Sequence, residues 1–134
     1  MKIPLDSHIL LWALAGHEKL PQKAVEMIQN PDNLIFYSVA SLWELSLKHA
    51  VHPENVEFSC LELCNYCDEA EYLPLDVRRE HILVSETLRR KDGARRHKDP
   101  FDRILLAQAK AEGMVFLTHD SLLADYGEPC VIVV

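Results

Sequence analysis

Short apolar runs alternate with longer stretches of helical periodicity along the whole chain. Compact apolar runs are typical of buried strands, and they predict strands at residues 2–5, 34–37, 72–75, 114–117 and 130–134. Between them, apolar residues recur at the spacing of one helix face, which predicts helices at residues 7–15, 21–29, 39–49, 59–70, 77–90, 100–112 and 121–124. This alternation is typical of an α/β fold, so we expect a mostly parallel sheet of about five short strands with helices on both faces.

Individual residues support the limits of several helices. Ser38 can cap the third predicted helix, and Asp99 followed by Pro100 is typical of a helix start. Gly113 is expected to end the helix that begins at Pro100. Residues 91–98 are polar and basic, and we expect them to form a loop before this helix.

Length and composition agree with one domain over residues 1–134. The chain has 134 residues, of which 49% are hydrophobic and 26% are charged, an ordinary balance for a soluble domain. No apolar run approaches the roughly 18 residues that a membrane span needs. Residues 1–16 also lack the pattern of a secretory signal. We therefore expect a cytoplasmic protein with no membrane association.

The chain contains four cysteines, Cys60, Cys64, Cys67 and Cys130. They are too few and too clustered for a disulfide framework. The first three repeat at the spacing of one helix face, and free cysteine behaves as a small buried hydrophobe, so we interpret them as core residues. The same spacing resembles an iron–sulfur ligand pattern, which is the alternative interpretation. The two tryptophans, Trp12 and Trp43, lie in apolar helical patterns and are also expected in the core.

Acidic residues follow or face the ends of the predicted strands. Asp6 follows the first strand, Asp120 follows the fourth, and Glu44 lies in the helix after the second. Asp99 and Asp102 begin the helix that precedes the fourth strand. Ligand sites of parallel sheets lie outside the carboxyl ends of the strands, so we expect these carboxylates at one edge of the sheet. An oxygen-only cluster of this kind suits Mg²⁺ or Mn²⁺, which can activate water against a phosphodiester.

Each acid also has a purely structural interpretation. Asp6, Asp99 and Asp120 can cap the helices that follow them, and Asp102 can complete a capping pair with Asp99. Glu44 can pair with a lysine one turn later in its helix. The arrangement of several acids around one expected edge favours a shared site over separate caps.

Four segments carry a resemblance to a known family: Ile3–His8, Ser41–Leu45, Lys98–Ala109 and Leu117–Asp120. Together they resemble PIN-domain proteins, and most closely the VapC-type toxins of bacterial toxin–antitoxin pairs. The segments occur in the family's order and span most of the chain. The sequence Asp-Pro-Phe-Asp-Arg at residues 99–103 is the most specific of them.

The resemblance implies a PIN-like three-layer α/β/α sandwich that acts as a Mg²⁺- or Mn²⁺-dependent endoribonuclease and cleaves RNA with metal-activated water. It implies a cognate antitoxin as partner, in a homodimer or a toxin–antitoxin hetero-oligomer. The residues at the family's acidic positions, expected to bind the metal and carry catalysis, are Asp6, Glu44, Asp102 and Asp120. The residues expected to support them are Ser7, Asp99 and Thr118.

A basic segment lies beside these acids, although the net charge of −7 excludes a protein that binds nucleic acid by its overall charge. Residues 78–103 contain nine Lys or Arg and five Asp or Glu, a local charge of +4. Such a segment can bind RNA phosphates, and a solvated loop is the alternative. The candidates for RNA binding are Arg89, Arg90, Lys91, Arg95, Arg96, Lys98 and Arg103.

Two other classes of protein fit parts of this pattern. A catalytically silent PIN-like domain would be an interaction module, but the complete set of acids favours a nuclease. A receiver-type signalling domain also has a parallel sheet with an acidic Mg²⁺ pocket, and Asp76 follows the third predicted strand. Asp6 has no acidic neighbour, however, and no lysine follows residue 110, which disfavours the receiver domain.

Overall fold

Five short strands organise the chain, and the computed structural model describes all residues, 1–134. The strands are β1 (Lys2–Pro4), β2 (Leu34–Ser38), β3 (Leu73–Leu75), β4 (Phe116–Thr118) and β5 (Val131–Val133). β2 pairs in parallel with both β1 and β3, and β4 pairs in parallel with β5. The predicted parallel arrangement is therefore confirmed.

The regular sheet is smaller than predicted because its ladder is interrupted between β1 and β4. One sheet holds three strands in the order β1-β2-β3, and the other holds β4 and β5. Isolated contacts join them: the N–H of Asp6 donates to the carbonyl of Leu117 at 3.0 Å, and the N–H of Val115 donates to the carbonyl of Lys2 at 3.0 Å. The five strands consequently follow one another in the order β3-β2-β1-β4-β5.

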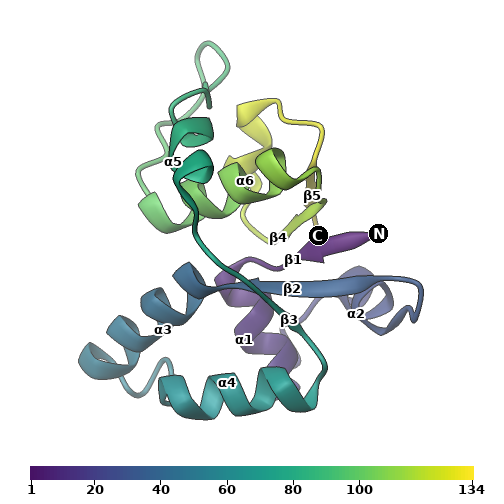
Figure 1. Ribbon diagram of the computed structural model, residues 1–134. Coiled ribbons are helices and arrows are strands. Elements are labelled where there is room, and N and C mark those ends of the chain that lie inside the picture. Colours follow the sequence, from purple (N-terminus) through teal and green to yellow (C-terminus); the bar gives the residue numbers. More distant parts are fainter.

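Helices cover both faces of these strands. They are α1 (Ser7–Ala15), α2 (Gln22–Gln29), α3 (Val39–Val51), α4 (Cys60–Glu69), α5 (Arg79–Ser85), α6 (Pro100–Glu112) and the 3₁₀ helix η1 (Ser121–Tyr126). Figure 1 shows α1, α3 and α4 on one side of β1 and β2, with α5 and α6 on the other. None of these helices combines the length and the hydropathy that crossing a lipid bilayer requires.

Two hydrophobic cores fill the spaces between these layers. Ile35 and Tyr37 of β2 belong to the core under α1–α4, whereas Phe36 between them packs against the core under α6 and η1. In β4, Leu117 belongs to the core under α1–α4 and Phe116 belongs to the core under α6 and η1. Neighbouring strand residues point to opposite faces of a sheet, so strands covered on both faces are apolar throughout. The three-layer prediction is confirmed.

The helix predicted over residues 77–90 is shorter, and it ends at Ser85. The chain continues in turns, and Leu88 packs at 1% exposure in the second core. The guanidinium of Arg103 donates to the carbonyls of Ser85 and Leu88, at 2.9 and 3.4 Å. The carbonyl of Ser85, which would pair with the N–H of Arg89 in a longer helix, accepts from Arg103 instead, and this contact favours the early end.

The packing predictions for cysteine and tryptophan are only partly right. Cys67 is fully buried in the first core, Cys64 is half-buried, and Cys60 is exposed at the start of α4. Trp12 packs against the first core, but Trp43 is 64% exposed. The prediction is wrong for Cys60 because it is the first residue of α4, although Cys67 on the same helix face is buried. It is wrong for Trp43 because α3 turns Glu44 and Leu45 to the interior instead.

Candidate metal centre

Asp6 stands where β1 passes into α1, and its carboxylate joins three elements. One oxygen accepts the N–H of Ile9 at 2.7 Å, which caps α1. The other accepts the hydroxyl of Thr118 at 2.5 Å and the N–H of His119 at 3.1 Å, at the end of β4. The structural interpretation of Asp6 as a cap is therefore correct. Asp6 also places a buried carboxylate at the sheet edge, because the residue is only 3% exposed.

Asp102 lies in the first turn of α6, which Asp99 caps by accepting the N–H groups of Phe101 and Asp102 at 2.9 and 3.2 Å. Burial raises the pKa of Asp102 to about 8, and the negative charges of Asp99, Asp6, Glu44 and Asp120 add to this rise. The fold therefore brings the other predicted acids close enough for their charges to act on Asp102. Without a cation, Asp102 is mostly protonated at neutral pH.

Glu44 points from the middle of α3 into the same region and is 4% exposed. Its Oε2 atom pairs with Lys48 Nζ at 2.9 Å, the helical pair that the spacing predicts. Its Oε1 atom is buried without a hydrogen-bond partner. An unpaired buried carboxylate oxygen is costly, and a bound cation would remove that cost.

Asp120 begins η1, and its Oδ1 atom accepts the N–H of Leu122 at 2.9 Å. Its own N–H donates to the Thr118 hydroxyl at 3.0 Å, so Thr118 links the Asp6 carboxylate to the Asp120 backbone. The other carboxylate oxygen, Oδ2, remains free to face the site. Thr118 thus holds the Asp6 carboxylate and the backbone of Asp120.

Ser7 supports the site less directly than predicted. Its hydroxyl donates to the hydroxyl of Ser41 at 2.9 Å, and both side chains are buried. This bond ties the first turn of α1 to α3, the helix that carries Glu44. Ser7 therefore positions helices and has no hydrogen bond to a carboxylate of the site.

Sequence reasoning missed His97, which the fold places among the acids. Its side chain is 3% exposed, and Nε2 lies 3.5 Å from Asp102 Oδ2 and 3.8 Å from Asp120 Oδ2. Burial lowers the pKa of His97; Arg90 and Arg103 lower it further, while Asp120 and Asp99 oppose them. The available signal was its position two residues before the cap of α6, within a segment that reads only as a basic loop.

The basic residues predicted to bind RNA divide into two groups. Arg90 donates to the carbonyls of Leu122 and Arg95, and its guanidinium lies 4.8 Å from the centre of the Tyr126 ring. Arg89 and Arg103 also donate to backbone carbonyls of the protein. Arg90 thereby ties the loop to η1, whereas Arg89 and Arg103 bind carbonyls at and just after the end of α5.

The second group keeps its charge available to a ligand. Lys91 pairs with Asp125 at 3.0 Å but is 69% exposed. Arg95, Arg96 and Lys98 are exposed and form no side-chain hydrogen bond or ion pair. The candidate RNA contacts are thereby reduced to the loop at residues 91–98.

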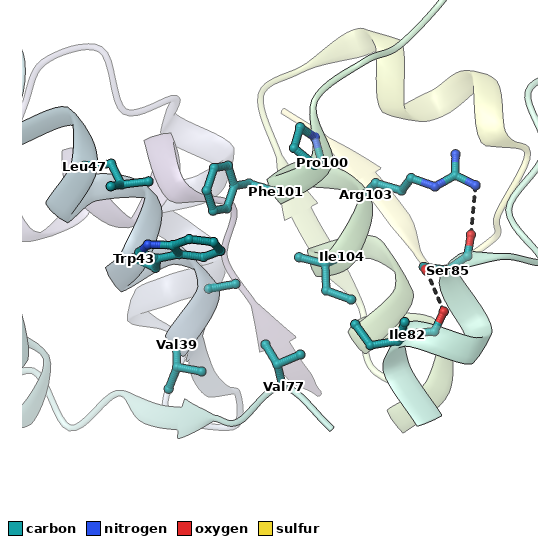
Figure 2. Close-up of a pocket in the computed structure, with 11 residues that line it drawn as sticks. Val39, Trp43, Leu47, Val77, Ile82, Ser85, Pro100, Phe101, Arg103 and Ile104 are labelled. Carbon is teal, nitrogen blue, oxygen red and sulfur yellow. Dashed lines mark hydrogen bonds between the residues drawn. The ribbon is translucent and has the colours of Figure 1, made fainter. Parts of the chain in front are cut away.

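An apolar groove of about 820 Å³ runs beside the acids, between α3, α5 and α6. Figure 2 shows Trp43 of α3 facing Phe101 of α6, and their ring centres are 5.3 Å apart. Trp43 and Phe101 are the immediate sequence neighbours of Glu44 and Asp102, so the groove borders the acidic site. Leu47 extends its apolar lining along α3.

The chain is similar to proteins of known structure along its whole length. The family model described as PIN domain matches residues 3–129. VapBC2 from Rickettsia felis, bound to a DNA fragment from their promoter, has a TM-score of 0.68 and 18% identity, covering 100% of this chain and 98% of that chain. DNA-bound VapBC from Salmonella typhimurium has a TM-score of 0.64 and 18% identity, covering 100% and 97% of the two chains.

A toxin–antitoxin complex from Klebsiella pneumoniae has a TM-score of 0.61 and 19% identity, covering 98% of this chain and 96% of that chain. No curated protein sequence matches the chain significantly. At these identities, the three solved structures establish a shared fold.

Proposed function

Because the chain belongs to the PIN domain family, we propose that it is a metal-dependent endoribonuclease and the toxin of a VapC-type toxin–antitoxin pair. The observation that carries this proposal is that the negative charges of Asp6, Glu44 and Asp120 all act on the partly buried Asp102. These acids come from four separate elements and meet at the carboxyl edge of a parallel sheet, where α/β proteins hold their ligands. The shared fold with VapBC and toxin–antitoxin complexes supports the toxin role.

The residues present fit a divalent cation. Their donors are carboxylate oxygens, Glu44 Oε1 is buried without a partner, and burial with crowding by like charges raises the pKa of Asp102 to about 8. Asp102 and Asp120 would hold Mg²⁺ or Mn²⁺, with Asp6 and Glu44 acting directly or through water. When bound, such a cation supplies Lewis-acid activation of water and neutralises charge on the phosphodiester.

The chain's own contacts hold the carboxylates in place before RNA binds. Asp6 accepts three hydrogen bonds, and the Thr118 hydroxyl connects it to the backbone of Asp120. The capped first turn of α6 fixes the backbone of Asp102. A site held in this way needs little reorganisation during the reaction, which is a general requirement for strong electrostatic catalysis.

Replacing Asp6 with asparagine should abolish cation-stimulated cleavage of a structured RNA. It should also destabilise the fold by about 1–3 kcal/mol, because the NH2 group of the new amide would oppose either the N–H of Ile9 or the two donors from Thr118 and His119. Cleavage is measured at a temperature where circular dichroism shows the variant folded. Full activity of a folded Asp6→Asn protein, purified free of wild type, would remove Asp6 from the active site.

Replacing both Arg95 and Arg96 with alanine should weaken RNA binding and its dependence on salt. For single-stranded RNA, each phosphate that the protein no longer neutralises reduces the slope of log affinity against log salt concentration by about 0.7. The measurement is fluorescence anisotropy of a labelled RNA over a salt series. Lys19→Ala with Lys23→Ala is the matched control, since it removes two exposed cations elsewhere. Equal slopes for the two double variants would contradict a binding role for this loop.

The antitoxin is proposed to cover the apolar groove beside the acids. Trp43 and Leu47 are 64% and 46% exposed there, and a contiguous apolar surface of this kind is typical of protein–protein contact. Trp43 and Phe101, the sequence neighbours of Glu44 and Asp102, line the groove, so a basic side chain of the same partner could reach the carboxylates. A partner bound in this way would block RNA access to the site.

A further inference from the structure

We infer that His97 is a nitrogen ligand of the cation in this site, and that the site therefore takes a first-row transition-metal ion in preference to Mg²⁺. This inference rests on the proposed function to the extent that a cation binds among the acids. It replaces an oxygen-only site by a mixed site of His97, Asp102 and Asp120. Imidazole nitrogen suits transition metals, whereas Mg²⁺ prefers oxygen donors.

The distances fit one ion between three donors. Nε2 of His97 lies 3.5 Å from Asp102 Oδ2 and 3.8 Å from Asp120 Oδ2, and one ligand atom from each residue lies within 4.8 Å of the other two. With metal–ligand bonds of about 2.1 Å, tetrahedral neighbours are about 3.4 Å apart and opposite octahedral ligands about 4.2 Å apart. The two separations from Nε2, 3.5 and 3.8 Å, fall within this range.

The same distances exclude an ordinary hydrogen bond between the imidazole and either acid. Hydrogen bonds from nitrogen to oxygen rarely exceed about 3.2 Å, and both separations from Nε2 are longer. Nε2 is also buried without any hydrogen-bond partner. An unpaired buried nitrogen that faces two carboxylates is suited to binding one cation together with them.

The other ring nitrogen is held as metal-bound histidines are usually held. Nδ1 lies 2.8 Å from the hydroxyl of Tyr126, and when it donates this hydrogen bond, Nε2 carries the free electron pair. The guanidinium groups of Arg90 and Arg103 lie 4.8 and 5.9 Å from the centre of the Tyr126 ring and keep the tyrosine in place. The imidazole is therefore oriented toward Asp102 and Asp120 before any ion binds.

The test is pulsed electron paramagnetic resonance of the full chain loaded with Mn²⁺ alone. The wild type should show coupling of Mn²⁺ to a directly bound ¹⁴N nucleus. His97→Gln should lose this coupling, and its Mn²⁺ affinity by calorimetry should fall about tenfold or more, while its Mg²⁺ affinity changes much less. His119→Gln is the matched control, because His119 lies beside Asp120 but outside the proposed ligand set.

The outcomes separate this inference from the proposed function. Mn²⁺ binding without nitrogen coupling, or coupling that persists in His97→Gln, would overturn the role of His97 and leave an oxygen-only centre. Failure of the wild type to bind any divalent cation would overturn the metal-dependent nuclease itself. If His97→Gln does not fold, labelling the wild type with ¹⁵N-histidine still tests for a histidine ligand, because the coupling must then change from ¹⁴N to ¹⁵N, and His97 is the histidine grouped with Asp102 and Asp120.

Discussion

Replacing Asp102 with asparagine should abolish RNA cleavage and yet stabilise the cation-free protein at alkaline pH. The side chain is 16% exposed, and burial together with four neighbouring carboxylates raises its pKa to about 8. Asparagine has nearly the same shape and carries no charge to bury. It cannot replace the carboxylate in binding a cation, so we expect cleavage to fall by at least two orders of magnitude.

The stability effect has a definite sign. An aspartate of the unfolded chain has a pKa near 3.9, so the folded protein binds this proton more tightly than the unfolded chain does. The resulting stability is fully present below about pH 4 and is lost as the pH rises through about 8. The full difference corresponds to at most about 6 kcal/mol of unfolding free energy.

Urea unfolding in a chelator at pH 6 and pH 9 measures this effect. The wild type should be much less stable at pH 9, whereas Asp102→Asn should lose far less stability over the same range. Asp92→Asn is the matched control, since it removes an exposed acid from the neighbouring loop and should behave as wild type in both assays. Parallel pH profiles for Asp102→Asn and the wild type would show that Asp102 is not a buried acid with a raised pKa.

Replacing Trp43 with alanine should weaken binding of the antitoxin by about thirtyfold or more. Aromatic residues that anchor an interface typically contribute about 2 kcal/mol or more to the binding free energy. Trp43 is 64% exposed in the isolated chain and faces Phe101 across the groove (Figure 2). Because it is not part of either hydrophobic core, its removal should leave the unfolding transition almost unchanged.

The measurement is calorimetry with the purified antitoxin, which we expect to be encoded next to this chain. Leu61→Ala is the matched control, because Leu61 is 72% exposed on α4 and does not line the groove. Trp43→Ala should also retain RNA cleavage, since no atom of Trp43 belongs to the acidic cluster. Equal affinities of Trp43→Ala, Leu61→Ala and the wild type would place the antitoxin elsewhere.

Most of the secondary structure follows from local pattern. The helix at Ser7–Ala15 is observed with the limits predicted, because Asp6 caps it and the chain turns at Gly16. The helix at residues 77–90 is shorter than its pattern predicts, because its end depends on contacts from Arg103 that are distant in the sequence. Local signals therefore predict the beginning of a helix better than its end, because the end can depend on tertiary contacts.

The candidate site divides in a similar way. Asp6, Glu44 and Asp120 could be predicted because parallel strands must bring their carboxyl ends to one edge. His97 could not, since nothing near it in the sequence shows that its loop folds inward against Tyr126. The prediction for Trp43 is wrong because an apolar residue on a helix has the same pattern whether it faces a core or a groove.

The sequence by itself determined the order of strands and helices, the two-sided burial of the sheet and the set of acids at its edge. These follow from periodicity and from the geometry of parallel strands, which are local or topological properties. Only the tertiary structure decided which basic side chains bind groups of the protein itself, as Arg90 and Arg103 do. It also decided which polar atoms are buried without a partner, as in His97 and Glu44. Burial and pairing arise between residues far apart in the chain, so local sequence cannot determine them.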